Sequence, residues 1–228
     1  MVFKKFSVLM SIYYKEDPEF LKQSLNSVLE QTLKPSEIVL VKDGELTYEL
    51  DEVINQFVVQ YPNMFKIVAL EKNVGLGEAL QTGLLNCTYE IVARMDSDDI
   101  CLPNRFEKQI EIFDKDTSID LVGSYIAEFE TDTKKIKSVR AVPCEFCDIV
   151  KKAKNRNPFN HVTVMFRKSA VIEAGNYKRF LWYEDYYLWI RMLLQNHKAV
   201  NIPDILVYVR TGTSMFKRRG GLKVFLNE

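Results

Sequence analysis

The chain has 228 residues, enough for one large domain that buries most of its apolar surface without disulfides or structural metals. Hydrophobic residues make up 47% and charged residues 27%, as in ordinary soluble globular proteins. Lys and Arg together number 31, as do Asp and Glu, so the net charge of zero gives no reason to expect nucleic-acid binding.

Strand-like and helix-like patterns alternate over the first half of the chain. Asp17 followed by Pro18 predicts the N-cap and the first residue of a helix. Apolar spacing predicts these elements in order: strand 6–13, helix 18–32, strand 37–41, helix 46–61, strand 65–70, helix 75–85 and strand 89–95. Such alternation indicates βαβ units and a mostly parallel sheet, whose ligands bind beyond the carboxyl ends of the strands. Three polar clusters follow strand ends: Tyr13-Tyr14, Lys42-Asp43-Gly44 and Asp96 to Asp99.

The pattern changes after about residue 116. We expect strands 119–130 and 135–142, helix 146–155, strand 162–166, a short helix 168–174 that Gly175 ends, helix 183–196 and strand 202–210. A basic, glycine-containing segment begins at Lys217. With no repeat and no linker, the sequence predicts one α/β domain over residues 1–228, divided into halves 1–115 and 116–228. The helical pattern near its end leaves open a continuation beyond residue 228.

The four cysteines do not resemble the disulfide framework of a secreted protein. Cys144 and Cys147 form an isolated C-x-x-C, which we interpret as two reduced thiols, because only His161 and His197 could complete a zinc site. The apolar run at 6–14 is too short and too polar for a signal peptide or a membrane span. We therefore expect a cytoplasmic protein, with a location at the inner face of the plasma membrane left open.

Asp96, Asp98 and Asp99 come directly after a predicted strand. Three carboxylates this close repel one another, and a divalent cation relieves the repulsion most naturally. Oxygen ligands suit Mg²⁺ or Mn²⁺, with substrate phosphates completing the coordination. The alternative is that Asp99 caps the helix that begins near Pro103, but capping needs only one carboxylate. We favour the metal.

A second acidic pair, Glu184-Asp185, lies in a stretch rich in aromatic residues. Partial burial near a helix start would raise the pKa of a carboxyl group towards the range useful to a general base. The alternative, an acid in the first helical turn favoured by the helix dipole, is preferred on composition alone. The surrounding aromatic residues, among them Trp182 and Trp189, would form either core or a platform for a sugar.

Residues Asn73 to Gly77 follow a strand and open a helix, but the dinucleotide fingerprint G-x-G-x-x-G fails because its last position is Leu80. We expect these glycines to let the backbone approach a ligand or a loop. His161 stands alone before a strand, and a lone histidine is more often structural.

Taken in order and spacing, these segments resemble glycosyltransferase family 2, whose catalytic domain has the GT-A fold. The resemblance runs from Phe6 to about Gly221. It rests on Ser7-Val8-Leu9-Met10-Ser11 with the helix Leu21 to Gln31, Glu37 to Val41 ending in Asp43-Gly44, Asn73-x-Gly75, Met95-Asp96-Ser97-Asp98-Asp99, and Glu184-Asp185-x-x-Leu188-Trp189-x-Arg191. It implies an α/β, Rossmann-like, mostly parallel central sheet with flanking helices and a small antiparallel portion on the acceptor side.

The resemblance also implies an activity: transfer of a sugar, with inversion, from a nucleotide-diphosphate donor such as a UDP-sugar to a hydroxyl group, assisted by Mn²⁺ or Mg²⁺. Residues 1–115 would bind the nucleotide sugar, and 116–228 would supply the acceptor site and the catalytic base. The implied roles are metal ligand for Asp98, general base for Asp185, nucleotide binding for Ser11, Tyr13, Asp43, Asn73, Gly75 and Asp96, and a place near the acceptor or diphosphate for His161, Glu184 and Arg210.

The chain departs from the family pattern at three places. Lys42-Asp43 stands where many relatives have two acids, Glu78 or Gln81 stands where a basic residue is usual, and no histidine follows Arg210. The short chain resembles bacterial enzymes of capsule or exopolysaccharide synthesis, whose acceptors are sugars on a polyprenyl diphosphate carrier. Two alternatives remain: a sugar-phosphate nucleotidyltransferase, whose Gly-rich loop is missing after the first strand, and an inactive nucleotide- or carbohydrate-binding module.

Overall fold

The computed structural model describes residues 5–211. The first half contains β1 (Phe6–Ile12), α1 (Pro18–Leu29), β2 (Glu37–Lys42), α2 (Tyr48–Gln60), β3 (Phe65–Ala69), α3 (Leu76–Asn86), β4 (Ile91–Arg94), β5 (Ile100–Cys101) and α4 (Arg105–Lys115). The second half contains β6 (Ile119–Phe129), β7 (Ile136–Arg140), α5 (Phe146–Ala153), the short 3₁₀ helix η1 (His161–Thr163), β8 (Met165–Arg167), α6 (Lys168–Glu173), α7 (Glu184–Leu194) and β9 (Lys198–Arg210).

One sheet joins the two halves, in the strand order β3-β2-β1-β4-β8-β6-β9-β5, with β7 added to β6. Strands β3, β2, β1 and β4 are parallel neighbours. Strand β8 runs antiparallel between β4 and β6, while β9 is parallel to β6 and β7 is antiparallel to it. The expected mostly parallel sheet with an antiparallel portion in the second half is therefore confirmed.

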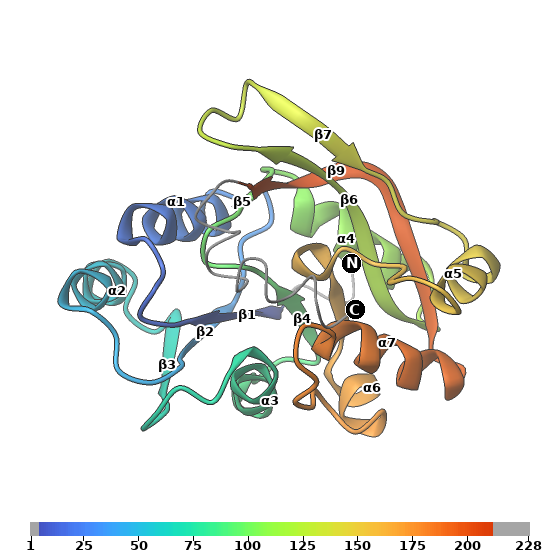
Figure 1. Cartoon of the computed structure of the whole chain (residues 1–228), viewed down its shortest axis with the longest axis horizontal. Coiled ribbons are helices and arrows are strands. Elements are labelled where there is room, and N and C mark those ends of the chain that lie inside the picture. The colour runs from blue at the N-terminus through green and yellow to red at the C-terminus, as the bar shows by residue number, and fades with distance from the viewer. Residues whose placement is uncertain (1–4, 212–228) are drawn as a thin grey trace, which may run out of the picture.

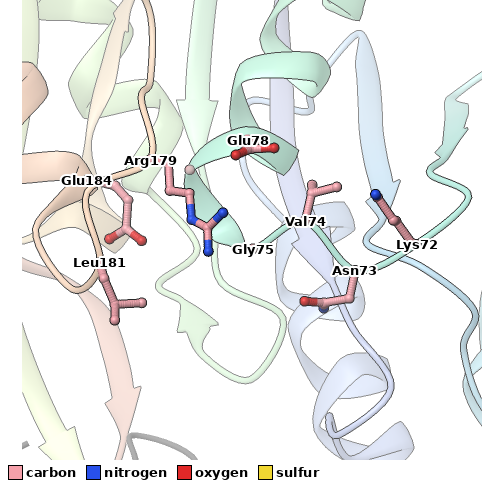
Figure 2. Close-up of a pocket in the computed structure, with 9 residues that line it drawn as sticks. Lys72, Asn73, Val74, Gly75, Glu78, Arg179, Leu181 and Glu184 are labelled. Carbon is pink, nitrogen blue, oxygen red and sulfur yellow. The ribbon is translucent and has the colours of Figure 1, made fainter.

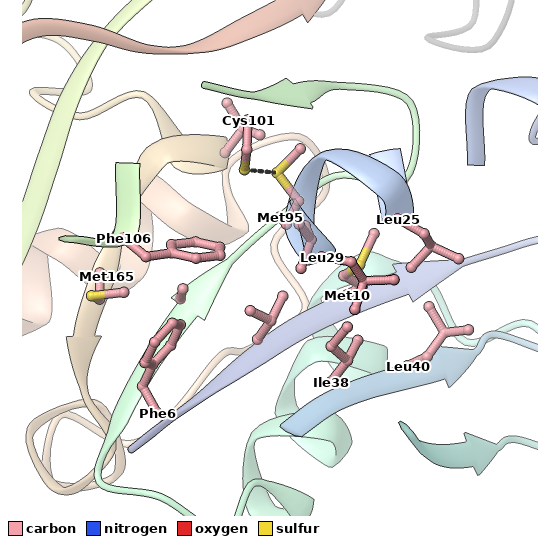
Figure 3. Close-up of a cluster of buried hydrophobic side chains, with 14 of the residues drawn as sticks. Phe6, Met10, Leu25, Leu29, Ile38, Leu40, Met95, Cys101, Phe106 and Met165 are labelled. Carbon is pink, nitrogen blue, oxygen red and sulfur yellow. Dashed lines mark hydrogen bonds between the residues drawn. The ribbon is translucent and has the colours of Figure 1, made fainter. Parts of the chain in front are cut away.

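Helices cover both faces of the parallel strands, with α1 and α2 on one side and α3, α6 and α7 on the other (Figure 1). Along β1, Val8 and Met10 belong to the core beneath α1, α2 and α4, whereas Leu9 belongs to the core beneath α3 and α7. This alternation follows from the two-residue period of a strand. Figure 3 shows part of the first core, where Phe106 of α4 packs on Phe6 with ring centroids 5.0 Å apart.

The helix signals near the start of the chain are confirmed. The side chain of Asp17 accepts hydrogen bonds from the backbone amides of Glu19 and Phe20, and Pro18 is the first residue of α1. The helix ends at Leu29, three residues earlier than predicted, because the amide of Thr32 donates to the carbonyl oxygen of Pro103 instead of continuing the helix.

Three strand predictions differ from the structure. The predicted strand 162–166 is wrong at its start, because the amide and hydroxyl of Thr163 bond to the carbonyl oxygen of Asn160 and form η1, so that β8 begins only at Met165. Strand β9 begins at Lys198, four residues early, through its pairing with β6. The two residues of β5 were not predicted as a strand; they pair with Val207 and Tyr208 of β9.

In the part of the chain that the structure describes, no helix is both long enough and apolar enough to cross a membrane. The basic segment that begins at Lys217 lies outside the described residues.

Candidate functional site

The carboxyl ends of β1, β2 and β4 meet at one edge of the sheet. Ile12 is paired with Lys42, and Leu9 is paired with Arg94, so the loops after the three strands lie next to one another. The structure thus places Ser11, Tyr13, Asp43 and Asp96 along the same edge, as the topology predicts.

Asp43 connects the ends of β2 and β3 to the start of α3. The residue is only 3% exposed, and its two carboxylate oxygens accept hydrogen bonds from the amides of Val74, at 2.7 Å, and Gly75, at 3.0 Å. Asn73 donates its side-chain amide to the carbonyl oxygen of Asp43 at 3.2 Å. The predicted nucleotide-binding residues Asp43, Asn73 and Gly75 therefore form one hydrogen-bonded group, in which Asp43 fixes the loop that precedes α3.

Arg94, the last residue of β4, is fully buried. Its Nη2 atom forms a salt bridge with Oδ1 of Asp96, and its Nε and Nη1 atoms have no hydrogen-bond partner within residues 5–211. The hydroxyl of Ser24 in α1 donates to the carbonyl oxygen of Asp96 at 2.8 Å. The Asp96 side chain is thus held by Arg94 at the carboxyl end of β4, and it is 37% exposed.

The loop Asp98-Asp99 is tied to the end of β9. Oδ1 of Asp99 accepts a hydrogen bond from the amide of Arg210 at 2.8 Å, and Nε of Arg210 donates to the carbonyl oxygen of Asp98 at 3.1 Å. Asp99 does not cap α4, whose N-cap is Asn104, so the capping interpretation of this acid is wrong. Arg210 also donates to Oε1 of Gln23 at 2.7 Å, which anchors it in the protein beside the acidic loop.

The acidic loop offers carboxylate oxygens, the kind of ligand that a divalent cation takes. Burial first, and then the negative charges of Asp98 and Asp96, raise the pKa of Asp99 well above its ordinary value. Among the described residues, no three His, Cys, Asp or Glu side chains converge to hold a metal on their own. A single carboxylate, that of Asp98, plus phosphate and water oxygens suits Mg²⁺ or Mn²⁺.

Among residues 5–211, Cys144 and Cys147 form no disulfide and belong to no cluster of metal-ligating side chains. Sγ of Cys144 lies 3.5 Å from the hydroxyl of Tyr125.

Glu184 and Asp185 form the first turn of α7. Nδ2 of Asn157 donates to Oδ2 of Asp185 at 2.6 Å, and this contact fixes the orientation of the half-buried carboxylate. Burial, and next the adjacent charge of Asp185, raise the pKa of Glu184 above its ordinary value.

His161 is the first residue of η1, which packs against β4. Its Nε2 atom is 3.1 Å from the hydroxyl of Tyr177, and its ring is 6.0 Å from that of the buried Trp189. Burial, followed by the positive charge of Arg94, lowers the pKa of His161 to about 4, while Asp185 and Asp96 act in the opposite direction. His161 therefore joins β4, against which η1 packs, to α7, which carries Trp189.

A cavity of about 470 Å³ opens between the start of α3 and the loop before α7 (Figure 2). Arg179 and Glu184 face the segment that contains Asn73 and Gly75 across it. The residues that line it are Lys72, Asn73, Val74, Gly75, Gly77, Glu78, Arg179, Leu181 and Glu184. Three of them, Asn73, Gly75 and Glu184, were predicted as site residues.

Sequence reasoning missed four residues of this site: Arg94, Asn157, Tyr177 and Arg179. The sequence did contain a signal for Arg94, because it is a charged residue at the end of the apolar run of β4. It stands two positions before Asp96, and this spacing places both residues on the same face of an extended chain. The other three are placed by contacts between distant segments and carried no local signal.

In the comparison with protein families, the model of "Glycosyl transferase family 2" matches residues 7–179. Among curated relatives, an uncharacterized glycosyltransferase of Haemophilus influenzae is 47% identical over 96% of this chain and 80% of its own length. The amylovoran biosynthesis glycosyltransferase AmsE of Erwinia amylovora is 45% identical over 98% of this chain and 82% of its own. The UDP-Gal:alpha-D-GlcNAc-diphosphoundecaprenol beta-1,3-galactosyltransferase of Escherichia coli is 40% identical over 98% and 80%.

Solved structures share the fold. S. aureus TarS 1-349 in complex with UDP-GlcNAc has a TM-score of 0.72 at 20% identity, over 92% of this chain and 60% of that chain. Mannosyltransferase PcManGT from Pyrobaculum calidifontis, in complex with GDP-Man and Mn²⁺, has a TM-score of 0.69 at 15% identity, over 91% and 57%. The chain thus spans less than two thirds of these two structures, and the likeness concerns their fold.

Proposed function

The chain belongs to glycosyltransferase family 2, and we propose that it transfers a sugar from a UDP-sugar to a hydroxyl group of a lipid-linked glycan in bacterial surface polysaccharide synthesis. The names of two relatives support this proposal. AmsE of Erwinia amylovora is named for amylovoran biosynthesis, and the Escherichia coli enzyme is named as a galactosyltransferase that uses UDP-Gal and GlcNAc-diphosphoundecaprenol. The UDP-Gal in the name of the Escherichia coli relative favours uracil as the base of the donor nucleotide, and we take guanine as the alternative to test.

One observation carries the proposal. Asp96 is held by Arg94 at the carboxyl end of β4, and Asp185 is held by Asn157 in the first turn of α7, whose Glu184 lines one cavity with Asn73 and Gly75. A site flanked by a strand-end acid on one side and an orientated carboxylate on the other provides what a direct displacement needs: a place for the leaving diphosphate and a base for the attacking hydroxyl.

On the donor side, we assign the ribose of the nucleotide to Asp96, which the salt bridge from Arg94 holds at the end of β4. Asp43 fixes the loop Asn73–Gly75, whose backbone would lie against the nucleotide. Family members usually have a basic residue on the helix that corresponds to α3, where this chain has Glu78 or Gln81. Arg179 lines the cavity at the start of α3 and supplies a positive charge there instead. We therefore assign the donor diphosphate or sugar to Arg179.

Asp98 would hold the divalent cation, which supplies positive charge that stabilises the departing diphosphate when bound. The acceptor side depends on Asp185. Its Oδ2 atom is occupied by the hydrogen bond from Asn157, and we assign the acceptor proton to Oδ1. As this carboxylate takes the proton, the hydroxyl oxygen bonds to the anomeric carbon and the bond from that carbon to the diphosphate oxygen breaks, its electron pair leaving with the diphosphate. A single displacement of this kind inverts the configuration at the anomeric carbon and needs no covalent enzyme intermediate.

The test is a transfer assay on the full chain with UDP-Gal, UDP-Glc and UDP-GlcNAc as donors and a lipid-diphosphate GlcNAc as acceptor. Asp185→Asn should lower kcat by roughly a thousandfold, the size expected for loss of a general base, and leave the donor affinity unchanged. Asp148→Asn, which removes an acid from the first turn of α5, is the matched control and should retain full activity.

Two outcomes would contradict the proposed mechanism: a product that retains the anomeric configuration of the donor, and full turnover by Asp185→Asn. Nucleotide binding without any turnover would favour a binding module, and formation of UDP-sugar from UTP and a sugar phosphate would favour a nucleotidyltransferase.

A further inference from the structure

The loop that precedes α7 presents a continuous run of exposed apolar side chains. Phe180, Leu181, Trp182 and Tyr183 are 51%, 68%, 46% and 42% exposed. Single apolar side chains on a surface are normal, whereas a contiguous group marks an interaction site. Lys178 and Arg179 come directly before this run and are also exposed, and neither forms a salt bridge with another described residue. We call residues 178–183 the apolar loop.

The backbone of the apolar loop is strained at its tryptophan. The amide of Tyr183 donates to the carbonyl oxygen of Phe180 at 2.8 Å and closes a four-residue turn. The third residue of this turn, Trp182, has φ +74°, a conformation that favours Gly or Asn and is unusual for a bulky side chain. A tryptophan kept at such a position indicates that the side chain itself has a use.

The apolar loop is also fixed to the proposed site. The ring of Phe180 lies 5.2 Å from that of Tyr187 in α7, and the guanidinium of Arg191 stacks 4.6 Å above Tyr187. Arg179 and Leu181 line the same cavity as Glu184 (Figure 2). Whatever binds the apolar loop is therefore held next to the first turn of α7 and its two acids.

We propose that the apolar loop docks the protein on the surface of an anionic phospholipid membrane and so brings Asp185 to a lipid-linked acceptor. The proposal rests on the proposed function. Trp and Tyr side chains favour the boundary between lipid and water, and each basic residue near an anionic membrane adds to the attraction. A platform for a sugar would need aromatic faces alone, but the most exposed member is Leu181, and two cations flank the run.

The chain offers its own probe, because it contains two tryptophans and only Trp182 is exposed, while Trp189 is fully buried. The full chain is mixed with vesicles of phosphatidylcholine, with or without phosphatidylglycerol, and tryptophan emission and co-sedimentation are measured. With phosphatidylglycerol, we expect a blue shift and quenching by brominated lipid, and both should disappear in Trp182→Phe.

The affinity for phosphatidylglycerol vesicles should fall severalfold in Lys178→Gln, which removes a cation outside the cavity lining, and roughly tenfold or more in Phe180→Ser/Leu181→Ser. Trp182→Gly separates docking from folding: it relieves the backbone strain, so it should be no less stable than the wild type and yet bind vesicles more weakly. Leu194→Ser is the control, since Leu194 is 78% exposed at the other end of α7, and its substitution should leave vesicle binding unchanged.

Equal vesicle binding by the wild type and the three loop variants would overturn the proposal. So would a dimer in solution that the loop variants dissociate, because a second copy would then be the occupant. Failure here is distinct from failure of the proposed function: vesicle binding needs no turnover, and transfer to a soluble acceptor should be unchanged in Trp182→Gly.

Discussion

Arg94 is a full charge inside the sheet, with one nitrogen paired to Asp96 and two without a partner among the described residues. Buried donors that lack a partner cost free energy, so the stability of the fold does not explain this arginine. Its contact with Asp96 instead suggests that it orientates a ligand-binding carboxylate.

We predict that Arg94→Met separates stability from binding. The free energy of unfolding should change by no more than about 1 kcal/mol, because removal of the unpaired donors offsets the loss of the salt bridge. Nucleotide affinity should fall about tenfold, because Asp96 loses the group that holds it. Urea denaturation and nucleotide titration measure the two effects, and a large loss of stability with unchanged affinity would contradict the assignment.

His161 gives the protein a dependence of stability on pH. Its folded-state pKa of about 4 lies below the ordinary histidine value of 6.5, so the unfolded chain takes up a proton first as the pH falls. The contribution of neutral His161 to the free energy of unfolding is complete above pH 6.5. It should decline by up to about 3 kcal/mol as the pH falls to 4. Denaturation curves of wild type and His161→Gln at several pH values measure this, and parallel curves over that range would contradict it.

At the scale of single residues, the candidate acids are visible in the sequence and their hydrogen-bond partners are not. The position of Asp185 after an aromatic run and that of Asp96 after a strand are visible in the sequence. Asn157, which holds Asp185 at 2.6 Å, lies 28 residues away, so no spacing could indicate it.

At the scale of elements, the join between β2 and α3 depends on two glycines with positive φ. Gly44 has φ +85°, and a Cβ atom there would lie 2.6 Å from the backbone nitrogen of Asn73. Gly75 has φ +92° as the N-cap of α3, and a Cβ atom at this position would meet no other atom within 4 Å. The first glycine is thus needed for its conformation and for close contact, and the second only for its conformation.

This difference predicts that replacement by alanine lowers the free energy of unfolding by different amounts at the two glycines. Gly75→Ala should lower the free energy of unfolding by about 1 kcal/mol, from backbone strain alone. Gly44→Ala should lower it by about 3 kcal/mol, because a steric clash with the Asn73 backbone is added. Chemical denaturation of both variants measures the costs, and equal losses would show that the close approach of Gly44 to Asn73 is unimportant.

Elements in which apolar residues recur over many positions were predictable from the sequence. Strands that exist only because they pair with another strand were not. Helices α1 and α3 follow from caps and spacing, whereas Ile100–Cys101 has too few residues to show a period and becomes a strand only by pairing with β9. Strand β9 begins at Lys198 because β6 extends that far, which the polar residues around Asn201 do not suggest.

At the scale of the whole molecule, β8 joins the two halves by pairing with β4 on one side and β6 on the other. The continuous sheet brings the end of β9, from the second half, to the acidic loop of the first half, where Arg210 donates to the carbonyl oxygen of Asp98. The parallel order of the first strands was predictable from the alternation of strands and helices, but the insertion of β8 between β4 and β6 is a contact between distant segments that the sequence does not show.

The central claim is that the acidic loop after β4 binds a nucleotide through a divalent cation, and calorimetric titration tests it most directly. UDP and GDP are titrated with and without Mn²⁺ into the wild type, Asp98→Ala and Glu52→Ala, the last being a control at an exposed acid of α2. We predict micromolar binding of UDP that requires Mn²⁺, is lost in Asp98→Ala and is retained in Glu52→Ala. Absence of nucleotide binding under every metal condition, or equal binding by Asp98→Ala, would contradict the account.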